Sequence, residues 1–339
     1  MSNPLEQAIL ASIPDGPSGG VVRVERGGEV LASLAWGDAD RRHGLAMRPD
    51  ARLAMASGSK GFTALAALGL VVDGALRLDT PARSLLGRDL PLISDEVTVE
   101  HLISHRSGIG DYIDDDADDA DYLLDVPVHR LLGPSDYLPM LAGVPSLFAP
   151  GTDFSYCNAG FIVLSLLIER AGGLPFHQVV SERVFEPAGM VDTAYLRSDA
   201  LPRDAALGYL RLDGQWVTNV LHLPIVGGGD GGAYTTAADL GRFWDALMGG
   251  RIVPTTMVDE LSRARSEGND DHDAYGLGFW LRSADRMIYL EGMDAGVSMR
   301  SGRMRGADLT FSVLGTTADA AWPVLRAVQE WAAHEQATA

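Results

Sequence analysis

The stretch MASGSKGFTALA, residues 55–66, contains the only lysine of the chain, Lys60. All other members of the chain's 27 Lys and Arg residues are arginine. An arginine guanidinium stays charged in a protein, whereas a lysine ammonium can lose its proton where the surroundings disfavour charge. A single retained lysine therefore indicates a position at which a proton is transferred.

Ser57 precedes Lys60 by three residues, and the apolar run GFTALAALGLVVDG that follows, residues 61–74, predicts a buried helix ending at Asp73 and Gly74. If Ser57 opens this helix, its hydroxyl and the lysine amine share one helix face. Such an amine can activate such a hydroxyl as a nucleophile. Alternatively, Ser57 is an N-cap and Lys60 is a surface charge. The motif alone does not distinguish a catalytic pair from this structural one, so the other segments of the chain have to be considered.

Composition restricts the possible classes of protein. With 339 residues, 46% of them hydrophobic, the chain forms one large domain or two smaller ones. The net charge of -19 disfavours nucleic acid and anionic membrane surfaces as partners. The single cysteine, Cys157, excludes an internal disulfide and a multi-cysteine zinc site, and we expect neither a metal nor a cofactor. Because no signal-peptide pattern and no apolar run of about 18 residues occurs, we expect a cytoplasmic protein that does not enter membranes.

Strand patterns occupy both ends of the chain. Residues 20–36 alternate apolar and polar side chains around Gly27-Gly28, which predicts a hairpin, and strands are expected again within 276–315. The segment 319–335 predicts an amphipathic helix with Pro323 in its first turn. We therefore expect an α/β (α+β) protein with an antiparallel sheet flanked by terminal helices.

The middle of the chain is expected to be helical, so two parts are predicted. Residues 1–56 and 226–339 form an α/β subdomain, residues 57–225 form a mainly helical one, and the cleft lies between them. Further predicted helices are 98–105 with Thr98 as N-cap, 158–173 closed by Gly172-Gly173, and 176–189 stopped at Pro187.

Two polar segments resemble ligand loops without matching them. The acidic run 111–125 lacks the central glycine and terminal glutamate of an EF-hand and is interpreted as a surface loop. The glycine-rich run 227–232 lacks the GK[ST] of a P-loop, and the helix after it is predicted to begin at Thr236 as N-cap.

Five segments in this order resemble the class C beta-lactamase-like serine hydrolases, a group of beta-lactamases, DD-peptidases, esterases and transacylases. The resemblance extends from the first hairpin to the C-terminal helix. It implies a serine beta-lactamase / DD-peptidase-like fold. The segments are LAMASGSKGFTALA (53–66), HLISHRSGIGDY (101–112), FAPGTDFSYCNAGF (148–161), FEPAGMVDTAY (185–195) and GGAYTTAADLGRF (231–243).

The resemblance implies that Ser57 is the acylated nucleophile, that Lys60 is its partner, and that Tyr156 and Asn158 form a second motif. A phenol with a pKa near ~10 acts as a base at neutral pH only if a nearby cation favours its phenolate, and Lys60 is that cation in one scheme. In the other scheme Lys60 is neutral and takes the serine proton itself. The sequence does not separate these two schemes.

Three residues near the second motif have alternative roles. Asn158 is expected to orient the substrate or the lysine, or to cap the helix that begins there, or both. Cys157 is interpreted as a small core residue rather than a thiol nucleophile, because its side chain should point away from Tyr156. His105 is interpreted as a structural histidine that binds backbone groups.

The third motif departs from the family pattern. If Gly296-Val297 match the family's Gly-Phe pair, the usual KTG or HxG triplet falls on Leu290-Glu291-Gly292, which contains no Lys or His. In the family this basic residue helps to hold the substrate carboxylate, so weak or no beta-lactamase activity is expected. Gly292 and Glu291 are nevertheless placed at the substrate by this alignment.

The oxyanion hole is expected to survive, because main-chain N–H groups form it. By position these are the N–H groups of Ser57 and Met293, and the loss of one such donor typically costs ~100 to 1,000-fold in rate. Glu291 and Asp294 are expected beside the cleft, where they would repel anionic substrates and favour neutral or cationic esters and amides. Alternatively, both are outward-facing strand or turn residues.

Three classes of function remain. The favoured one is a serine hydrolase that cleaves ester or amide bonds of small molecules through an acyl-enzyme. The second is a transacylase that passes the acyl group to an amine or alcohol, and the third is a non-catalytic relative that binds a ligand in the cleft.

Overall fold

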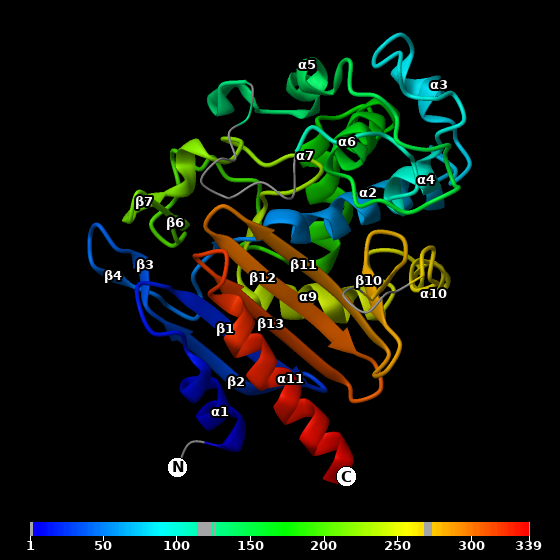
Figure 1. Ribbon diagram of the computed structural model, residues 1–339. Coiled ribbons are helices and arrows are strands. Elements are labelled where there is room, and N and C mark those ends of the chain that lie inside the picture. The colour runs from blue at the N-terminus through cyan, green and yellow to red at the C-terminus, as the bar shows by residue number, and fades with distance from the viewer. Residues whose placement is uncertain (1–2, 114–123, 125, 268–272, 339) are drawn as a thin grey trace.

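The computed structural model describes residues 3–113, 124, 126–267 and 273–338. Its centre is a seven-stranded antiparallel sheet in the order β2-β1-β13-β12-β11-β10-β9, so both ends of the chain contribute strands (Figure 1). The mixed fold with an antiparallel sheet confirms the predicted class. The strands of this sheet are β1 (Gly20–Arg26), β2 (Glu29–Trp36), β9 (Ala274–Tyr275), β10 (Trp280–Arg282), β11 (Met287–Asp294), β12 (Val297–Met304) and β13 (Leu309–Gly315).

The first hairpin forms as its alternating pattern predicts. β1 and β2 are joined at Gly27 and Gly28, which adopt φ angles of +56° and +84°, a conformation that glycine takes without steric cost. β1 also pairs with the last strand, from Gly20 opposite Gly315 to Arg26 opposite Leu309. The two chain ends are therefore joined by a continuous ladder.

Three short strand pairs lie outside the main sheet, and the helices pack on both of its faces (Figure 1). The short strands are β3 (Asp38–Asp40) with β4 (Leu45–Ala46), β5 (Leu53–Ala54) with β8 (Tyr234–Thr235), and β6 (Tyr209–Leu212) with β7 (Gln215–Thr218). The helices are α1 (Pro4–Ser12), α2 (Lys60–Val72), α3 (Ala82–Leu86), α4 (Val99–Ile103), α5 (Leu138–Leu141), α6 (Asn158–Gly172), α7 (Phe176–Val180), α8 (Glu186–Ala188), α9 (Ala237–Met248), α10 (Thr255–Leu261) and α11 (Ala321–Thr338).

Two apolar cores lie on opposite faces of the sheet. The smaller one lies under the terminal helices α1 and α11, and the larger one joins the other face to α9 and to the buried helices α2 and α6. Figure 1 shows the helical part on one side of the strands and α11 across the other. The predicted limits of the two parts, residues 57–225 against both chain ends, stay a prediction.

Most predicted helix ends are confirmed. The Thr98 side chain accepts a hydrogen bond from His101 N at the start of α4, and Thr236 does the same for Asp239 N at the start of α9. Gly173, which follows the last residue of α6, closes the helix in the left-handed conformation with φ +68°.

The predicted stop at Pro187 is wrong. A π-helical turn at Ser181–Phe185 leads into α8, whose first turn contains this proline, and the helix ends at Gly189. Proline is tolerated there because the first N–H groups of a helix have no intrahelical partner.

Two further predictions concern loops and membranes. Most of the acidic run 111–125 lies outside the described residues, but Asp111, Tyr112 and Ile113 are described and lie at the site below. Across the described chain, no single helix has the length and apolar composition of a membrane span; α6 together with 176–188 reaches them only as a pair bent by 80°.

Candidate active site

Short-range and long-range contacts fix the segment that carries Ser57. β5 pairs with β8 immediately before it, and Ala56 adopts a φ of +45°, which is uncommon for a residue with a Cβ. Ser59 Oγ donates to Ala56 O and accepts from Ala233 N, both at 3.0 Å. The half-buried Ser57 therefore sits on a 3₁₀ turn, Ala56–Ser59, that leads directly into α2.

Lys60 is the buried partner of this serine. Its side chain is 2% exposed, and Nζ lies 2.9 Å from Ser57 Oγ, 2.7 Å from Asn158 Oδ1 and 2.7 Å from the main-chain oxygen of Asp230. The reading of Lys60 as a surface charge is wrong. The i, i+3 geometry predicted from the sequence is present, because Lys60 begins α2 and the serine lies on the turn before it.

Asn158 supplies one acceptor of Lys60 and does not cap α6. Cys157 is the N-cap residue, and its Sγ accepts from Gly160 N at 3.2 Å. The carboxylate of Asp111 accepts hydrogen bonds from the N–H groups of Asn158 and Ala159. The prediction that Asn158 caps α6 is therefore wrong, because Cys157 is the N-cap. The predicted contact between Asn158 and Lys60 is present.

The ring of Tyr156 lies next to Lys60. Nζ is 4.8 Å from the ring centroid, which is within the range of a cation–π contact. The ring also lies 4.4 Å from the His105 ring and stacks on Trp280 at 6.2 Å. The structure thus brings together Ser57, Lys60 and Tyr156 from segments about 100 residues apart.

His105 is structural, as predicted. It is buried, and its Nδ1 accepts from Cys157 N at 3.0 Å, while its carbonyl oxygen accepts from Ser155 N. Burial, and secondarily the charge of Lys60, hold the pKa of His105 well below its ordinary value, so the ring stays neutral. Its role is to fix the segment that carries Tyr156.

Sequence reasoning missed Asp230 and Tyr112. Asp230 lies in the glycine-rich run 227–232, its main-chain oxygen binds Lys60, and its carboxylate accepts from Tyr112 Oη at 2.5 Å. Burial raises the pKa of Asp230, while the Lys60 charge and the Tyr112 hydrogen bond act in the opposite direction. The signals in the sequence were an aspartate among glycines and the position of Tyr112 at the end of the segment 101–112, and neither reveals partners far away in the chain.

The third motif lies against the nucleophile segment. A Cβ placed on Gly292 would lie 2.9 Å from Ser57 N and 2.2 Å from Met55 O, so β11 runs in contact with this backbone. Leu290, at the position of the family's basic residue, is buried and contacts Gly61 of α2. Met293 follows Gly292 at the strand end and is 58% exposed.

Glu291 does not lie in the pocket, contrary to the expectation. Its carboxylate forms an ion pair with Arg300 on the neighbouring strand β12, with which it is in register. Because alternate residues of a strand face opposite sides, Glu291 points away from the face that Leu290 and Gly292 turn toward the nucleophile. Its charge is paired on the side of the sheet that carries α11.

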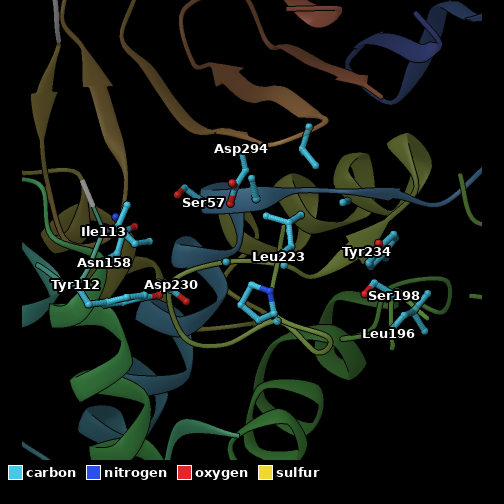
Figure 2. Close-up of a pocket in the computed structure, with 17 residues that line it drawn as sticks. Ser57, Tyr112, Ile113, Asn158, Leu196, Ser198, Leu223, Asp230, Tyr234 and Asp294 are labelled. Atoms are coloured by element: carbon cyan, nitrogen blue, oxygen red, sulfur yellow. Dashed lines mark hydrogen bonds between the residues drawn. The ribbon is translucent and has the colours of Figure 1, made fainter. Parts of the chain in front are cut away.

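A pocket opens beside Ser57 and contains Asp294, as expected (Figure 2). The lining residues include the carboxylates of Asp294 and Asp230 and, within the described chain, no Lys, Arg or His. Figure 2 shows Asp294 close to Ser57, and Tyr112 pointing toward Asp230. The larger apolar residues of the lining are Ile113, Leu196, Leu223, Pro224, Tyr234 and Val297.

Within the described ranges, no group of three or more His, Cys, Asp or Glu side chains is arranged to hold a metal ion. The chemistry available from the residues present is nucleophilic attack by a serine with an amine and a phenol as proton carriers.

Comparison with known proteins gives consistent matches. A family model described as Beta-lactamase matches residues 8–322. Esterase EstB of Burkholderia gladioli is 30% identical over 308 residues, which cover 78% of this chain and 75% of that protein. D-aminopeptidase of Cereibacter sphaeroides (ATCC 17023) is 36% identical over 209 residues, 60% of this chain but only 38% of that protein. Among solved structures, a penicillin-binding protein from Bacillus halodurans superposes with a TM-score of 0.89 at 34% identity. The matched region covers 96% of this chain and 99% of that protein's chain.

Proposed function

The chain belongs to the beta-lactamase family, and from this premise we propose that it is a serine hydrolase that cleaves ester or amide bonds of small molecules through an acyl-enzyme on Ser57. The observation that carries the proposal is the 2.9 Å contact between Ser57 Oγ and the buried Lys60 Nζ. The relatives named as an esterase and a D-aminopeptidase support the reaction class.

In the proposed reaction Ser57 Oγ attacks the substrate carbonyl carbon and gives its proton to the pair of Lys60 and Tyr156. The bond to the leaving alcohol or amine breaks, the leaving group takes the proton, and water then hydrolyses the acyl-enzyme. We assign the oxyanion hole to the N–H groups of Ser57 and Met293. The contact of Gly292 with the nucleophile backbone supports this assignment, because it brings β11 to Ser57 N.

Both proton schemes remain compatible with the three contacts of Lys60. An ammonium donates to all three oxygens, whereas a neutral amine donates to two of them and accepts from the serine hydroxyl. In the first case the cation next to the Tyr156 ring favours the phenolate as base; in the second Lys60 is the base.

Intact-mass spectrometry after incubation with p-nitrophenyl esters tests the proposal. We expect a transient acyl adduct on the wild-type protein and turnover in water, and no adduct on Ser57→Ala. A stable adduct that only added amine or alcohol discharges would assign a transacylase with such an acceptor. An unmodified, correctly folded wild-type protein with a broad panel of esters would contradict the proposal and leave a ligand-binding relative.

We further propose that the substrate is neutral or cationic near the scissile bond. Asp294 and Asp230 line the pocket, and no cationic side chain of the described lining can bind a carboxylate. Two donors matched in shape, one carboxylated and one neutral, should differ in kcat/KM in favour of the neutral one. Asp294→Asn should reduce this difference, whereas Glu291→Gln should leave it unchanged because Glu291 pairs with Arg300 on the other face. A preference of the wild-type enzyme for the carboxylated donor would contradict this assignment.

The cytoplasmic location also stays part of the proposal. Fractionation of cells that express the native gene, followed by immunodetection, tests it.

A further inference from the structure

Lys60 depends on two acceptors that come from distant loops. Asn158 Oδ1 is at the first residue of α6, and the Asp230 main-chain oxygen belongs to the run 227–232, 98 and 170 residues away along the chain. Both contacts are 2.7 Å long. What fixes these two acceptors therefore fixes the orientation of the amine.

Asp111 fixes the first acceptor. Its carboxylate accepts from Asn158 N and, at 3.1 Å, from Ala159 N, the first N–H groups of α6. These groups have no partner within the helix, and a negative charge near them is also favoured by the helix dipole. The carboxylate thus holds the main chain of the residue whose side chain binds the lysine.

Tyr112, the next residue, fixes the second acceptor. Its hydroxyl donates to Asp230 Oδ2 at 2.5 Å, and its ring lies against that of Tyr137 with the centroids 5.9 Å apart. Figure 2 shows the Tyr112 side chain reaching across to Asp230 at the edge of the pocket. Two adjacent residues therefore hold the two loops that supply the lysine acceptors.

We propose that Asp111 and Tyr112 are positioning residues that act together as a bracket, setting the protonation equilibrium and the orientation of Lys60 in the acylation reaction. This proposal deepens the proposed function and rests on it for its kinetic part only. Neither residue is assigned contact with the reacting atoms; each acts through Asn158 or Asp230.

The bracket has a defined electrostatic direction. Removing the Tyr112 hydroxyl releases Asp230, so the ammonium form of Lys60 loses a well-placed acceptor and the pKa of Lys60 should fall. The Tyr112 hydrogen bond also lowers the pKa of Asp230, so its loss makes this carboxyl easier to protonate and weakens its attraction for the ammonium. Both effects therefore lower the pKa of Lys60. Among the described residues, the titratable groups near Lys60 include Tyr156 on the segment before α6, His105 after α4, and Asp230 on the glycine-rich run. Asp111 lies behind Asn158, Tyr112 binds Asp230, and Asp294 lines the pocket beside Ser57.

The single lysine makes this measurable without substrate. Protein labelled with ¹³C at lysine Cε has one lysine signal, that of Lys60, and its chemical shift against pH gives the titration midpoint. We expect Tyr112→Phe to move the midpoint to lower pH by about half a unit or more, since the contact between Lys60 Nζ and the Asp230 main-chain oxygen is then held less firmly but is not removed. The limb of the kcat/KM profile that reports Lys60 should move to lower pH as well.

Tyr137→Phe is the matched control. It removes a hydroxyl from the neighbouring buried ring, and that hydroxyl has no hydrogen-bond partner in the described chain. The control should leave the midpoint in place. If Tyr112→Phe does not fold, Asp111→Asn takes its place, because asparagine keeps one acceptor for the helix N–H groups but loses the charge.

A folded Tyr112→Phe or Asp111→Asn protein whose lysine titrates as in the wild type overturns the bracket, as does an equal shift in Tyr137→Phe. The outcome is separable from the proposed function. If the wild type never forms an acyl adduct but the midpoint shifts as stated, the function is wrong and the bracket stands. If the wild type turns over esters and the midpoint does not move, only the bracket is wrong.

Discussion

At the scale of single residues, the surroundings of Lys60 explain why this position is lysine, whereas every other Lys or Arg position of the chain is arginine. Its amine fits among three oxygens at 2.7–2.9 Å in a buried place where a guanidinium has neither the room nor the ability to release a proton. We therefore expect Lys60→Arg to lower kcat/KM by on the order of 10² to 10⁴-fold, the usual contribution of a positioned proton carrier. Stopped-flow acylation rates measure the loss. A thermal unfolding curve checks that the variant is folded, and near-normal acylation would exclude Lys60 as a proton carrier.

Cys157 makes a second prediction at this scale. Its sulfur caps α6 through Gly160 N and donates weakly to Ile109 O at 3.4 Å, so a serine hydroxyl finds both partners in place. Because serine is a preferred N-cap, Cys157→Ser should keep the turnover and change the free energy of unfolding by no more than ~1 kcal/mol. Denaturant unfolding and ester hydrolysis measure the two quantities. Loss of acylation in a stable variant would support the thiol as nucleophile.

The sequence predicted those site residues whose relation is local or motif-based. Ser57 and Lys60 are three residues apart, so helix geometry alone placed them together. The contacts of Asp111, Tyr112 and Asp230 were not found, because their partners lie 47 to 170 residues away. Asp111 and Tyr112 end the segment 101–112 and begin the acidic run, and Asp230 lies in a glycine run, so nothing local indicates these partners. Long-range hydrogen bonds of this kind have no periodic signature in the chain.

At the scale of elements, the approach of β11 to the nucleophile turn requires glycine. A Cβ at Gly292 would lie 2.2 Å from Met55 O, so Gly292→Ala must displace one of the two backbones. We expect the free energy of unfolding to fall by about 1–3 kcal/mol, as for other overpacked sites. Acylation should slow by up to ~100 to 1,000-fold, the cost of a lost oxyanion donor. Denaturant unfolding and acylation kinetics measure the two effects.

Gly306→Ala is the matched control, since the nearest atom to its added Cβ is 3.8 Å away at Asp285 O. This control should keep both the stability and the acylation rate. Equal behaviour of the two alanine variants would contradict the role assigned to β11.

The pairing of β11 with β12 also explains where the residues of the predicted third motif lie. The structure brings Gly292 next to the backbone of the nucleophile turn, and of the two positions expected for Glu291 it has the outward-facing one. Strand alternation decides this, and Arg300 in the paired register of β12 takes the carboxylate. The helix stop at Pro187 failed for a related reason, because a π-helical turn restarts the helix and places the proline in a tolerated position.

At the scale of the whole molecule, the two chain ends build one sheet whose faces have separate tasks. One face meets the nucleophile turn, and the other is covered by α1 and α11, where Val328 is fully buried. Val328→Ala should therefore lower the free energy of unfolding by about 1–3 kcal/mol. It should leave kcat unchanged, because the substitution is on the face away from Ser57. The exposed Glu330→Ala on the same helix should change stability by no more than ~0.5 kcal/mol. A drop in kcat for Val328→Ala at a temperature where it is folded would contradict the separation of the two faces.

Because Lys60 is only 2% exposed, the rate at which a lysine-specific protease cuts the folded chain measures local opening around this residue. An endoproteinase that cuts only after lysine has one target in the sequence and would yield residues 1–60 and 61–339. That bond is inaccessible until α2 separates from its neighbours, so the rate at which two fragments appear reports how often the catalytic centre opens. Any ligand that binds in the pocket and closes it would slow this one cleavage.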